Sequence, residues 1–310
     1  MTQSKKAINI IGTVAFDSIE TPKGKFPRII GGSGTFASLA ASIFSKVNLI
    51  SIIGKDFPDA MISDFNARGI NTDGVQRIPD GNTFHWHGYY LDDMNQAFTK
   101  ETELNILTQF NPILPEAAQN AEITFLANID PELQKKVIHQ LKNPKLIILD
   151  TMNLWLEHKL NEVKEVLKSV NIFMVNFEEI KLLTGLTNVV HAAEEVAKLG
   201  PKVVIVKKGE HGAIMFSQGK YFAMPAFPLA EVEDPTGAGD TFAGSFTGFL
   251  SEAETITEDV LRTALIVGTI TSSYTVQGMG IEKIKSITKK DLSARIRDYR
   301  KITNLPQLEI

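Results

Sequence analysis

Residues 233–247 read EDPTGAGDTFAGSFT. Pro235 and the glycines predict a tight turn, and the small and aromatic residues after them have the spacing of a buried helix. Gly237, Ala238 and Gly239 therefore stand at a helix N-terminus. Unpaired N–H groups there carry roughly half a positive charge and bind phosphate oxygens where no side chain blocks the approach. The stretch predicts an anion-binding turn.

Asp240 follows this turn directly, although a carboxylate would repel a bound phosphate. One interpretation is a helix cap, because aspartate is favoured at helix N-termini. The other is catalysis, in which Asp240 takes a proton from a hydroxyl group that then attacks phosphorus. The local pattern alone favours neither interpretation.

Composition limits the remaining classes of function. The chain has 310 residues, of which 43% are hydrophobic, and this is enough for a substantial core. Its net charge of −4, with scattered lysines and arginines, argues against nucleic-acid binding. The absence of cysteine excludes disulfides and thiolate metal sites. The sequence shows no signal peptide and no run of about 18 apolar residues, so we expect a cytoplasmic protein with no membrane partner.

Short β-branched runs alternate with amphipathic stretches along most of the chain. The predicted strands are INIIGTV, VNLISIIG, EITFLANI, KLIILDT, NIFMVNF and KVVIVKKG. Helical spacing follows in GTFASLAASIFSK, PELQKKVIHQLK, NEVKEVLKSV and VVHAAEEVAKLG, and two further helices are expected near the C-terminal end. Strands that are apolar on both faces predict a doubly wound, mostly parallel sheet between helix layers.

Two segments, residues 14–31 and 82–107, break this alternation. They are rich in aromatic residues, have extended character around turns, and contain no helical pattern. We expect them to form a small antiparallel β lid beside the main sheet.

The signature DPTGAGDTFAGSF resembles that of the ribokinase-like, or PfkB, family of carbohydrate and nucleoside kinases. Four other segments resemble the family in the expected order: GTVAFDSI, GGSGTFASLAAS, NFEEIKLLTG and VKKGEHGA. Together these segments extend over residues 8–280. The resemblance implies one ribokinase-like α/β kinase domain over residues 1–310, with a β lid.

The resemblance also implies an activity. It gives Asp240 the role of general base and the N–H groups of Gly237, Ala238 and Gly239 the role of an anion hole. The expected reaction is transfer of the γ-phosphoryl group of ATP to a hydroxyl of a small sugar, with Mg²⁺ as cofactor. A nucleoside kinase and a catalytically silent ligand-binding relative remain the alternatives.

Further roles are implied by matching positions. Substrate binding falls to Asp17, Gly31, Gly32 and Ser33, nucleotide binding to Lys207, Gly209 and Gly212, Mg²⁺ binding through water to Asn176 and Glu179, and K⁺ binding to Asp234 with loop 277–280. Each has a structural alternative: a capping box for Asn176 and Glu179, a turn for Asp17 and Asp234, and a solvated lysine for Lys207.

Two positions depart from the family pattern. Phe36 stands where the first signature usually has an asparagine, and Lys207 stands where a small hydroxyl residue is common. The change at Phe36 removes an amide that would contact a sugar hydroxyl.

Other site classes fit less well. The sequence has no G-x-x-x-x-G-K-[ST] loop, and GGSGTF does not match the G-x-G-x-x-G dinucleotide pattern. His85 and His87 alternate on one strand, but no third histidine completes a metal site. The aromatic residues Phe84, Trp86, Tyr89 and Tyr90 either cover the ligand or form a homodimer surface on the lid.

Overall fold

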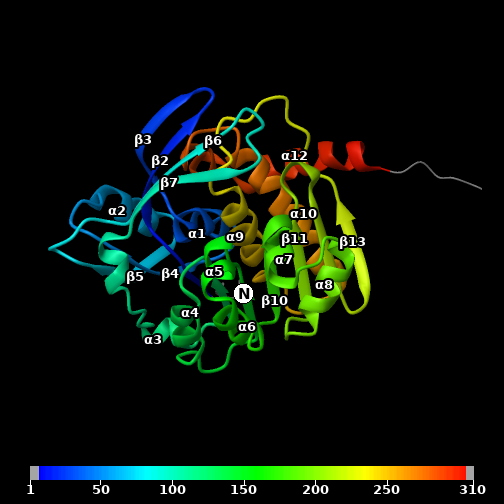
Figure 1. Ribbon diagram of the computed structural model, residues 1–310, viewed down its shortest axis with the longest axis horizontal. Helices are drawn as coiled ribbons and strands as arrows, with labels where there is room; N and C mark the ends of the chain where they lie inside the picture. The colour runs from blue at the N-terminus through cyan, green and yellow to red at the C-terminus, as the bar shows by residue number, and fades with distance from the viewer. Residues whose placement is uncertain (1–6, 305–310) are drawn as a thin grey trace, which may run out of the picture.

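The computed structural model describes residues 7–304, and these contain two β-sheets (Figure 1). The strands are β1 (Ile8–Ile11), β2 (Ala15–Thr21), β3 (Gly24–Gly31), β4 (Val47–Ile53), β5 (Ile70–Arg77), β6 (His85–Tyr90), β7 (Ala97–Glu103), β8 (Ile123–Leu126), β9 (Leu146–Leu149), β10 (Ile172–Asn176), β11 (Val203–Lys207), β12 (Ala213–Ser217) and β13 (Lys220–Met224). The large sheet has the order β13-β12-β11-β10-β9-β8-β1-β4-β5, and the small sheet has the order β3-β2-β6-β7.

The large sheet is mostly parallel. Every pairing from β11 through β1 to β5 is parallel, and only the pairings β11–β12 and β12–β13, at one edge, are antiparallel. Strands β1, β4 and β9 are buried along their whole length. Burial on both faces is the arrangement that continuous apolar runs predict. The predicted doubly wound, mostly parallel sheet is confirmed.

Helices cover both faces of this sheet. They are α1 (Ser33–Ser42), α2 (Asp59–Ala67), α3 (Glu116–Gln119), α4 (Pro131–Ile138), α5 (Asn153–His158), α6 (Leu160–Leu167), α7 (Phe177–Thr184), α8 (Val189–Ala197), α9 (Ala238–Leu250), α10 (Glu258–Thr275), α11 (Glu282–Ser286) and α12 (Lys289–Thr303), with short 3₁₀ helices at Asn105–Gln109 and Gly209–His211. One apolar cluster joins the sheet to α1, α2, α9, α10 and α12, and another joins its opposite face to α3–α8. Figure 1 shows these two layers.

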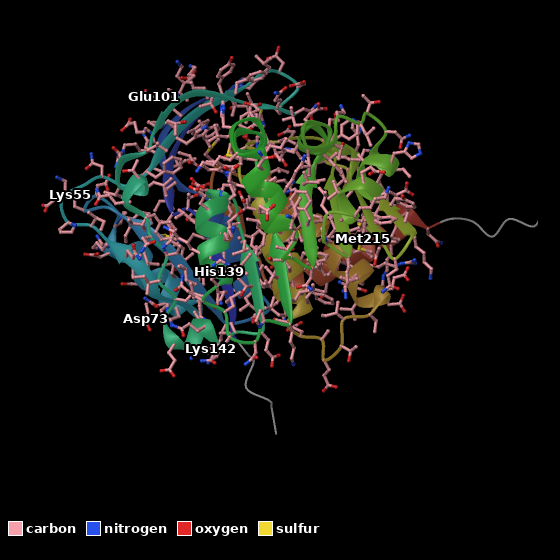
Figure 2. All side chains as sticks on the ribbon, turned by 60° about the horizontal axis from the view of Figure 1, so that its bottom comes forward. Lys55, Asp73, Glu101, His139, Lys142 and Met215 are labelled. Atoms are coloured by element: carbon pink, nitrogen blue, oxygen red, sulfur yellow. The ribbon has the colours of Figure 1, made fainter. Side chains whose placement is uncertain are left out.

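Polar and apolar side chains are separated as this layering requires. Figure 2 places Lys55, Asp73 and Glu101 at the periphery, and all three are exposed. Met215, on strand β12, is only 1% exposed. The apolar groups removed from water by this packing stabilise the fold.

The small sheet, here called the lid, contains both segments that break the α/β alternation. Strands β2 and β3 come from the first segment, and β6 and β7 from the second. The pairs β2–β3 and β6–β7 are antiparallel, as predicted, while the central pair β2–β6 is parallel. Strand β2 begins four residues after β1 ends, so the lid continues directly from the core of the large sheet.

Helices α1 and α9 pack unusually close together through small residues. A Cβ atom on Gly244 would lie 2.2 Å from Ala37 O, and one on Gly248 would lie 2.8 Å from Ala41 O. Both values are shorter than van der Waals contact, so only glycine permits this approach. The contact joins the helix that begins with the GAG turn to the helix that begins with Ser33.

Candidate active site

The first turn of α9 is built as the sequence predicts. Gly237 is the N-cap, with φ of 74°. A Cβ atom there would lie 2.3 Å from the ring of Phe36, so glycine is required both by the left-handed backbone and by the buried ring. The Ala238 N–H donates to Pro235 O at 3.2 Å. Within residues 7–304, the N–H groups of Gly237, Gly239 and Asp240 have no partner, so these groups are free to bind an anion.

Asp240 lies third in α9, after Ala238 and Gly239. It is not the N-cap, and no donor in the described part of the chain hydrogen-bonds to its carboxylate. The capping interpretation of Asp240 is therefore wrong. Burial, reinforced by the negative charge of Asp150 and opposed by Lys207, raises the pKa of Asp240 to about 7. A carboxylate with a pKa near neutrality and no hydrogen bond is suited to accept a proton.

A second charged group lies beside this turn. The Lys207 ammonium group, at the end of β11, is paired with Asp150 at 2.6 Å, and the two side chains are 17% and 4% exposed. The interpretation of Lys207 as a merely solvated lysine is wrong. Asp150 was not predicted, although its position directly after the buried strand LIIL places it at the carboxyl edge of the sheet, where parallel α/β sheets bind ligands.

Asn176 and Glu179 form the capping box of α7. The Asn176 Oδ1 atom accepts from the Glu179 N–H, and Glu179 Oε2 accepts from the Asn176 N–H, both at 2.8 Å. The capping box expected as the structural alternative for these two residues is therefore confirmed. Burial is the main cause that raises the pKa of Glu179 to about 8, and Asp150 adds to the rise while Lys207 opposes it.

The same cluster also has the chemistry of a magnesium site. Glu179 Oε1 accepts no hydrogen bond among the residues described. The Asp150 and Asp240 carboxylates both lie close enough to influence the pKa of Glu179 and the pKa of Lys207. Hard oxygen donors of this kind suit Mg²⁺, which keeps several of its waters. Within residues 7–304, no group of three acidic, histidine or cysteine side chains converges for direct metal ligation.

Asp17 lies within strand β2 of the lid, next to the glycine turn that precedes α1. A Cβ atom on Gly31 would lie 1.9 Å from Asp17 Oδ2, and Gly32 has φ of 96°. Asp17 is therefore not a turn residue. Burial, and then the charges of Asp234 and Asp240, raise its pKa to about 8. Ser33 is engaged in the structure, because its Oγ accepts from the Thr13 N–H and donates to Asn128 O.

Asp234 links the signature to loop 277–280. Its Oδ1 accepts from the Thr236 N–H at 2.9 Å, and its Oδ2 accepts from the Gly280 N–H at 3.0 Å. Both oxygens therefore stabilise the turn. This contact accounts for Asp234 without a bound cation, and it also places the carboxylate beside the loop that was expected to complete a K⁺ site.

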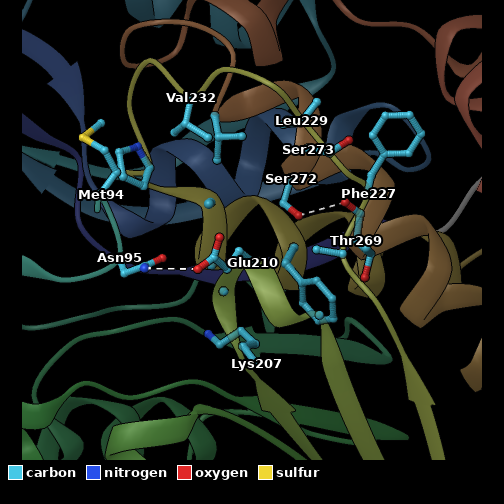
Figure 3. A pocket seen from close by; sticks show the side chains of 18 of the residues that line it. Met94, Asn95, Lys207, Glu210, Phe227, Leu229, Val232, Thr269, Ser272 and Ser273 are labelled. Carbon is cyan, nitrogen blue, oxygen red and sulfur yellow. Dashed lines mark hydrogen bonds between the residues drawn. The ribbon is translucent and has the colours of Figure 1, made fainter. Parts of the chain in front are cut away.

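A pocket of about 560 Å³ opens beside the GAG turn (Figure 3). Its lining includes the predicted residues Lys207, Gly209, Gly212, Ala238 and Gly239. Sequence reasoning missed much of the wall. This part is formed by the apolar residues Phe227, Leu229 and Val232 from the segment after β13 and by the hydroxyl-bearing residues Thr269, Ser272 and Ser273 of α10. These segments have no phosphate-binding pattern, and only the fold brings them to the pocket.

The turn between β6 and β7 reaches this pocket from the lid. Met94 and Asn95 line it, and Asn95 Nδ2 donates to Glu210 Oε1 at 3.3 Å (Figure 3). At the end of β6 where this turn begins, Tyr90 and Thr236 share a hydrogen bond of 3.0 Å between their hydroxyl groups. The lid therefore contacts both the signature turn and the wall of the pocket.

The lid aromatic residues divide between the two faces of the sheet. Trp86 and Tyr90 alternate with Tyr89 along β6, and Tyr90 faces Thr236 of the core. The Trp86 indole lies over Gly88, where a Cβ atom would be 2.1 Å from the ring. On the other face, Tyr89 stacks on Phe98 with ring centroids 5.2 Å apart. His85 contacts Ser18 and Glu103, and His87 contacts Glu20, so the two histidines do not form a metal pair.

Known proteins resemble this chain over most of its length. The family model described as pfkB family carbohydrate kinase matches residues 5–285. A cytidine kinase of Thermococcus kodakarensis is 30% identical over 258 residues, which are 81% of this chain and 91% of that protein. A ribokinase of Lactococcus lactis is 25% identical, with 94% of this chain and 99% of that protein covered.

Solved structures share the fold. The nucleoside kinase of Methanocaldococcus jannaschii superimposes with a TM-score of 0.76 at 19% identity, over 94% of this chain and 98% of that one. The ribokinase of Arabidopsis thaliana, complexed with ribose and ATP, gives 0.74 at 22% identity, over 94% and 99%. None of the helices in residues 7–304 is long and apolar enough to cross a membrane. From its family-model match and its geometry, the chain is a member of the pfkB family of carbohydrate kinases.

Proposed function

We propose that this kinase transfers the γ-phosphoryl group of ATP to a hydroxyl group of a small sugar. The observation that carries the proposal is the first turn of α9, where the Asp240 carboxylate accepts no hydrogen bond from the described residues and stands among unpaired N–H groups. A base and an anion-binding turn at one place are what phosphoryl transfer to an alcohol needs.

The proposed reaction follows from these positions. Asp240 takes the proton of the acceptor hydroxyl while the acceptor oxygen forms a bond to the γ-phosphorus. The bond from that phosphorus to the β–γ bridging oxygen breaks, and its electron pair leaves with ADP. The N–H groups of Gly237, Gly239 and Asp240 donate to the phosphoryl oxygens, where negative charge develops.

The remaining predicted residues receive supporting roles. Asp17, with Gly31 and Gly32 beside it, binds acceptor hydroxyls. The pocket of about 560 Å³, with Lys207, Gly209 and Gly212 in its lining, holds the nucleotide. Glu179, supported by Asn176, holds Mg²⁺ through water, and the bound ion supplies positive charge to the phosphate oxygens.

Asp234 is also the proposed anchor of a K⁺ site with loop 277–280. Exchange of K⁺ for a large organic cation should then lower turnover. Equal rates in the two salts would remove this site.

A nucleoside is the second candidate acceptor, and Trp86 favours it. Its indole lies over Gly88, on the lid face that carries Asp17 and Tyr90, where a nucleobase ring would stack. Phe36, in place of the usual asparagine, removes one contact to a sugar hydroxyl. The relative from T. kodakarensis is a cytidine kinase.

The test is ADP formation with a panel of pentoses, hexoses and nucleosides. Turnover with sugars alone supports the first candidate, and turnover with nucleosides alone supports the second. ATP and acceptor binding without turnover would contradict catalysis and favour the ligand-binding alternative.

The variant Trp86→Ala tests the proposed cover over the acceptor. It should raise KM for the acceptor or increase ATP hydrolysis without acceptor, because an open site admits water. Tyr89→Ala, on the opposite face of β6, is the matched control. If Trp86→Ala instead dissociated a homodimer on a sizing column with unchanged kcat/KM for the acceptor, the lid aromatics would serve an interface.

A further inference from the structure

We propose that Lys207 is a catalytic residue whose ammonium group contacts the transferred phosphoryl group, and that Asp150 holds this ammonium group in position. The inference rests on the proposed kinase reaction and adds a residue to it. It also explains why a lysine stands at the end of β11, where the family pattern has a small hydroxyl residue.

Position is the first argument. Lys207 is part of the pocket wall, and a Cβ atom on Gly239 would lie 3.3 Å from Lys207 Nζ. Gly239 is the second residue of α9, and its N–H group is one of those that have no partner in the described structure. Figure 3 shows Lys207 at the end of the pocket where β11 terminates. The ammonium group and the anion-binding N–H groups therefore face the same small volume.

Charge is the second argument. A helix N-terminus carries partial positive charge, so a lysine placed beside it is repelled unless an anion lies between them. Asp150, Glu179 and Asp240 all supply negative charge near Lys207, but of these three only Asp150 forms an ion pair with it, at 2.6 Å. Two positive features directed at one volume, with a pocket opening into it, describe a site for a multiply charged anion.

Preorganisation is the third argument. The Lys207 side chain is 17% exposed, and its ion pair with Asp150 restricts the motion of a flexible four-carbon stem. Asp150 is itself fixed, because its Oδ1 accepts from the Thr151 N–H at 3.0 Å. Groups that are already in place where charge develops need no reorganisation during the reaction.

A purely structural role is the competing explanation. Lys207 would then serve only to neutralise the buried Asp150 carboxylate, and its removal would act by leaving that charge unpaired. The single variant Lys207→Met does not separate the two roles. The double variant Lys207→Met/Asp150→Asn, measured beside Asp150→Asn alone, does separate them, because it removes the unpaired charge, leaves an amide that still accepts from Thr151, and differs from the single variant only at Lys207.

Turnover of the full chain is the first measurement. If Lys207 contacts the phosphoryl group, both Lys207→Met and the double variant should lower kcat by about 10²-fold, with the acceptor KM little changed. Lys208→Met is the matched control, because Lys208 is the adjacent lysine and does not line the pocket. Recovery of kcat to within a few fold of wild type in the double variant would overturn the proposal.

Binding is the second measurement, and it does not depend on turnover. Calorimetry compares the affinity for Mg²⁺–ADP with and without aluminium fluoride, which imitates the transferred phosphoryl group. Aluminium fluoride should tighten binding in wild type and Lys208→Met, and this gain should fall by about tenfold or more in the double variant. An unchanged gain would overturn the assignment of Lys207. If no acceptor is phosphorylated by wild type, the proposed function fails, while this comparison still tests Lys207.

Discussion

Helices α7 and α9 start at the same edge of the large sheet, and both have a carboxylate as their third residue. In α7 this residue is Glu179, which exchanges hydrogen bonds with the N-cap Asn176. In α9 it is Asp240, whose N-cap is Gly237 and whose carboxylate has no donor within the described structure. One helix start is completed by its own side chains, and the other is left open.

This difference shows that a helix N-terminus left open for a ligand lacks the stabilisation that a side-chain N-cap contributes. A side-chain N-cap stabilises a helix by about 1 kcal/mol, because it satisfies N–H groups that otherwise lack partners. Gly237 contributes no such bond, so the N–H groups of α9 remain available for a ligand. We infer that local stability has been exchanged for binding at α9 and retained at α7.

The largest expected effect comes from Asp240→Asn. The change keeps the size of the side chain and removes the base, so kcat should fall by about 10²-fold or more while nucleotide affinity is largely kept. Stability should not fall. Because burial raises the pKa of Asp240 to about 7, the ionised carboxylate is unfavourable in the folded state, and the variant should be at least as stable as wild type at pH 8. Near-normal turnover would contradict the role of Asp240 as base.

The pH profile gives the next effect. With a pKa of about 7, Asp240 is protonated and inactive as a base at lower pH, so kcat/KM should fall about tenfold per unit below pH 7 and level off above it. The measurement is kcat/KM between pH 5.5 and 9 at constant ionic strength. Asp17 and Glu179 also have raised pKa values, and a steeper limb would show that one of them must ionise as well. A flat profile down to pH 5.5 would exclude Asp240 as the titrating base.

A pair of glycine substitutions separates backbone strain from crowding. Gly185→Ala changes the end of α7, where φ is 72° and nothing lies within 4 Å of a new Cβ, so about 1 kcal/mol of unfolding free energy should be lost. Gly237→Ala has a similar φ but meets the Phe36 ring at 2.3 Å, so its loss should be clearly larger, with reduced activity as well. Denaturant unfolding measures both changes. Equal losses would show that Phe36 moves aside at little cost.

The smallest effect is expected at Glu179. Glu179→Ala breaks the capping box and should lower the free energy of unfolding by about 1 kcal/mol, whereas Glu179→Gln keeps an accepting oxygen and should lose less. If Glu179 also holds Mg²⁺ through water, Glu179→Gln should raise the Mg²⁺ concentration needed for half-maximal rate. Wild-type Mg²⁺ dependence in Glu179→Gln would leave Glu179 as a cap alone, and unchanged stability in Glu179→Ala would contradict the contribution of the cap.

The interior of the fold follows closely from the sequence, and its edges do not. A strand such as β9, which reads LIIL, is a continuous apolar run that can only be buried, and all six predicted core strands are present. Strands β5, β12 and β13 were not predicted. The first reads INTDGVQR and the last KYFAM, and both are edge strands with polar residues, so their pairing depends on the neighbouring strand rather than on their own pattern.

The site was predictable where a residue type carries the chemistry. The GAG turn, Asp240 and Asp17 have recognisable sequence surroundings, and the structure brings them to one region. Asp150 and the apolar wall at Phe227 have no comparable pattern, and their relevance arises from contacts over long sequence separations. Burial also cannot be read from composition, which is why Lys207 resembled an exposed lysine in the sequence.

The contact between α1 and α9 fixes the relative position of the two turns that form the site. The proposed acceptor-binding turn precedes one helix, and the proposed base lies in the first turn of the other. The relative placement of these two turns therefore depends on how closely the helix backbones approach at Gly244 and Gly248. A single methyl group added at either glycine would push α1 and α9 apart. The alignment of the reacting groups thus depends on residues that do not contact the substrate. A substitution at Gly244 would lower the rate of catalysis by shifting the two helices, without changing any group in the site.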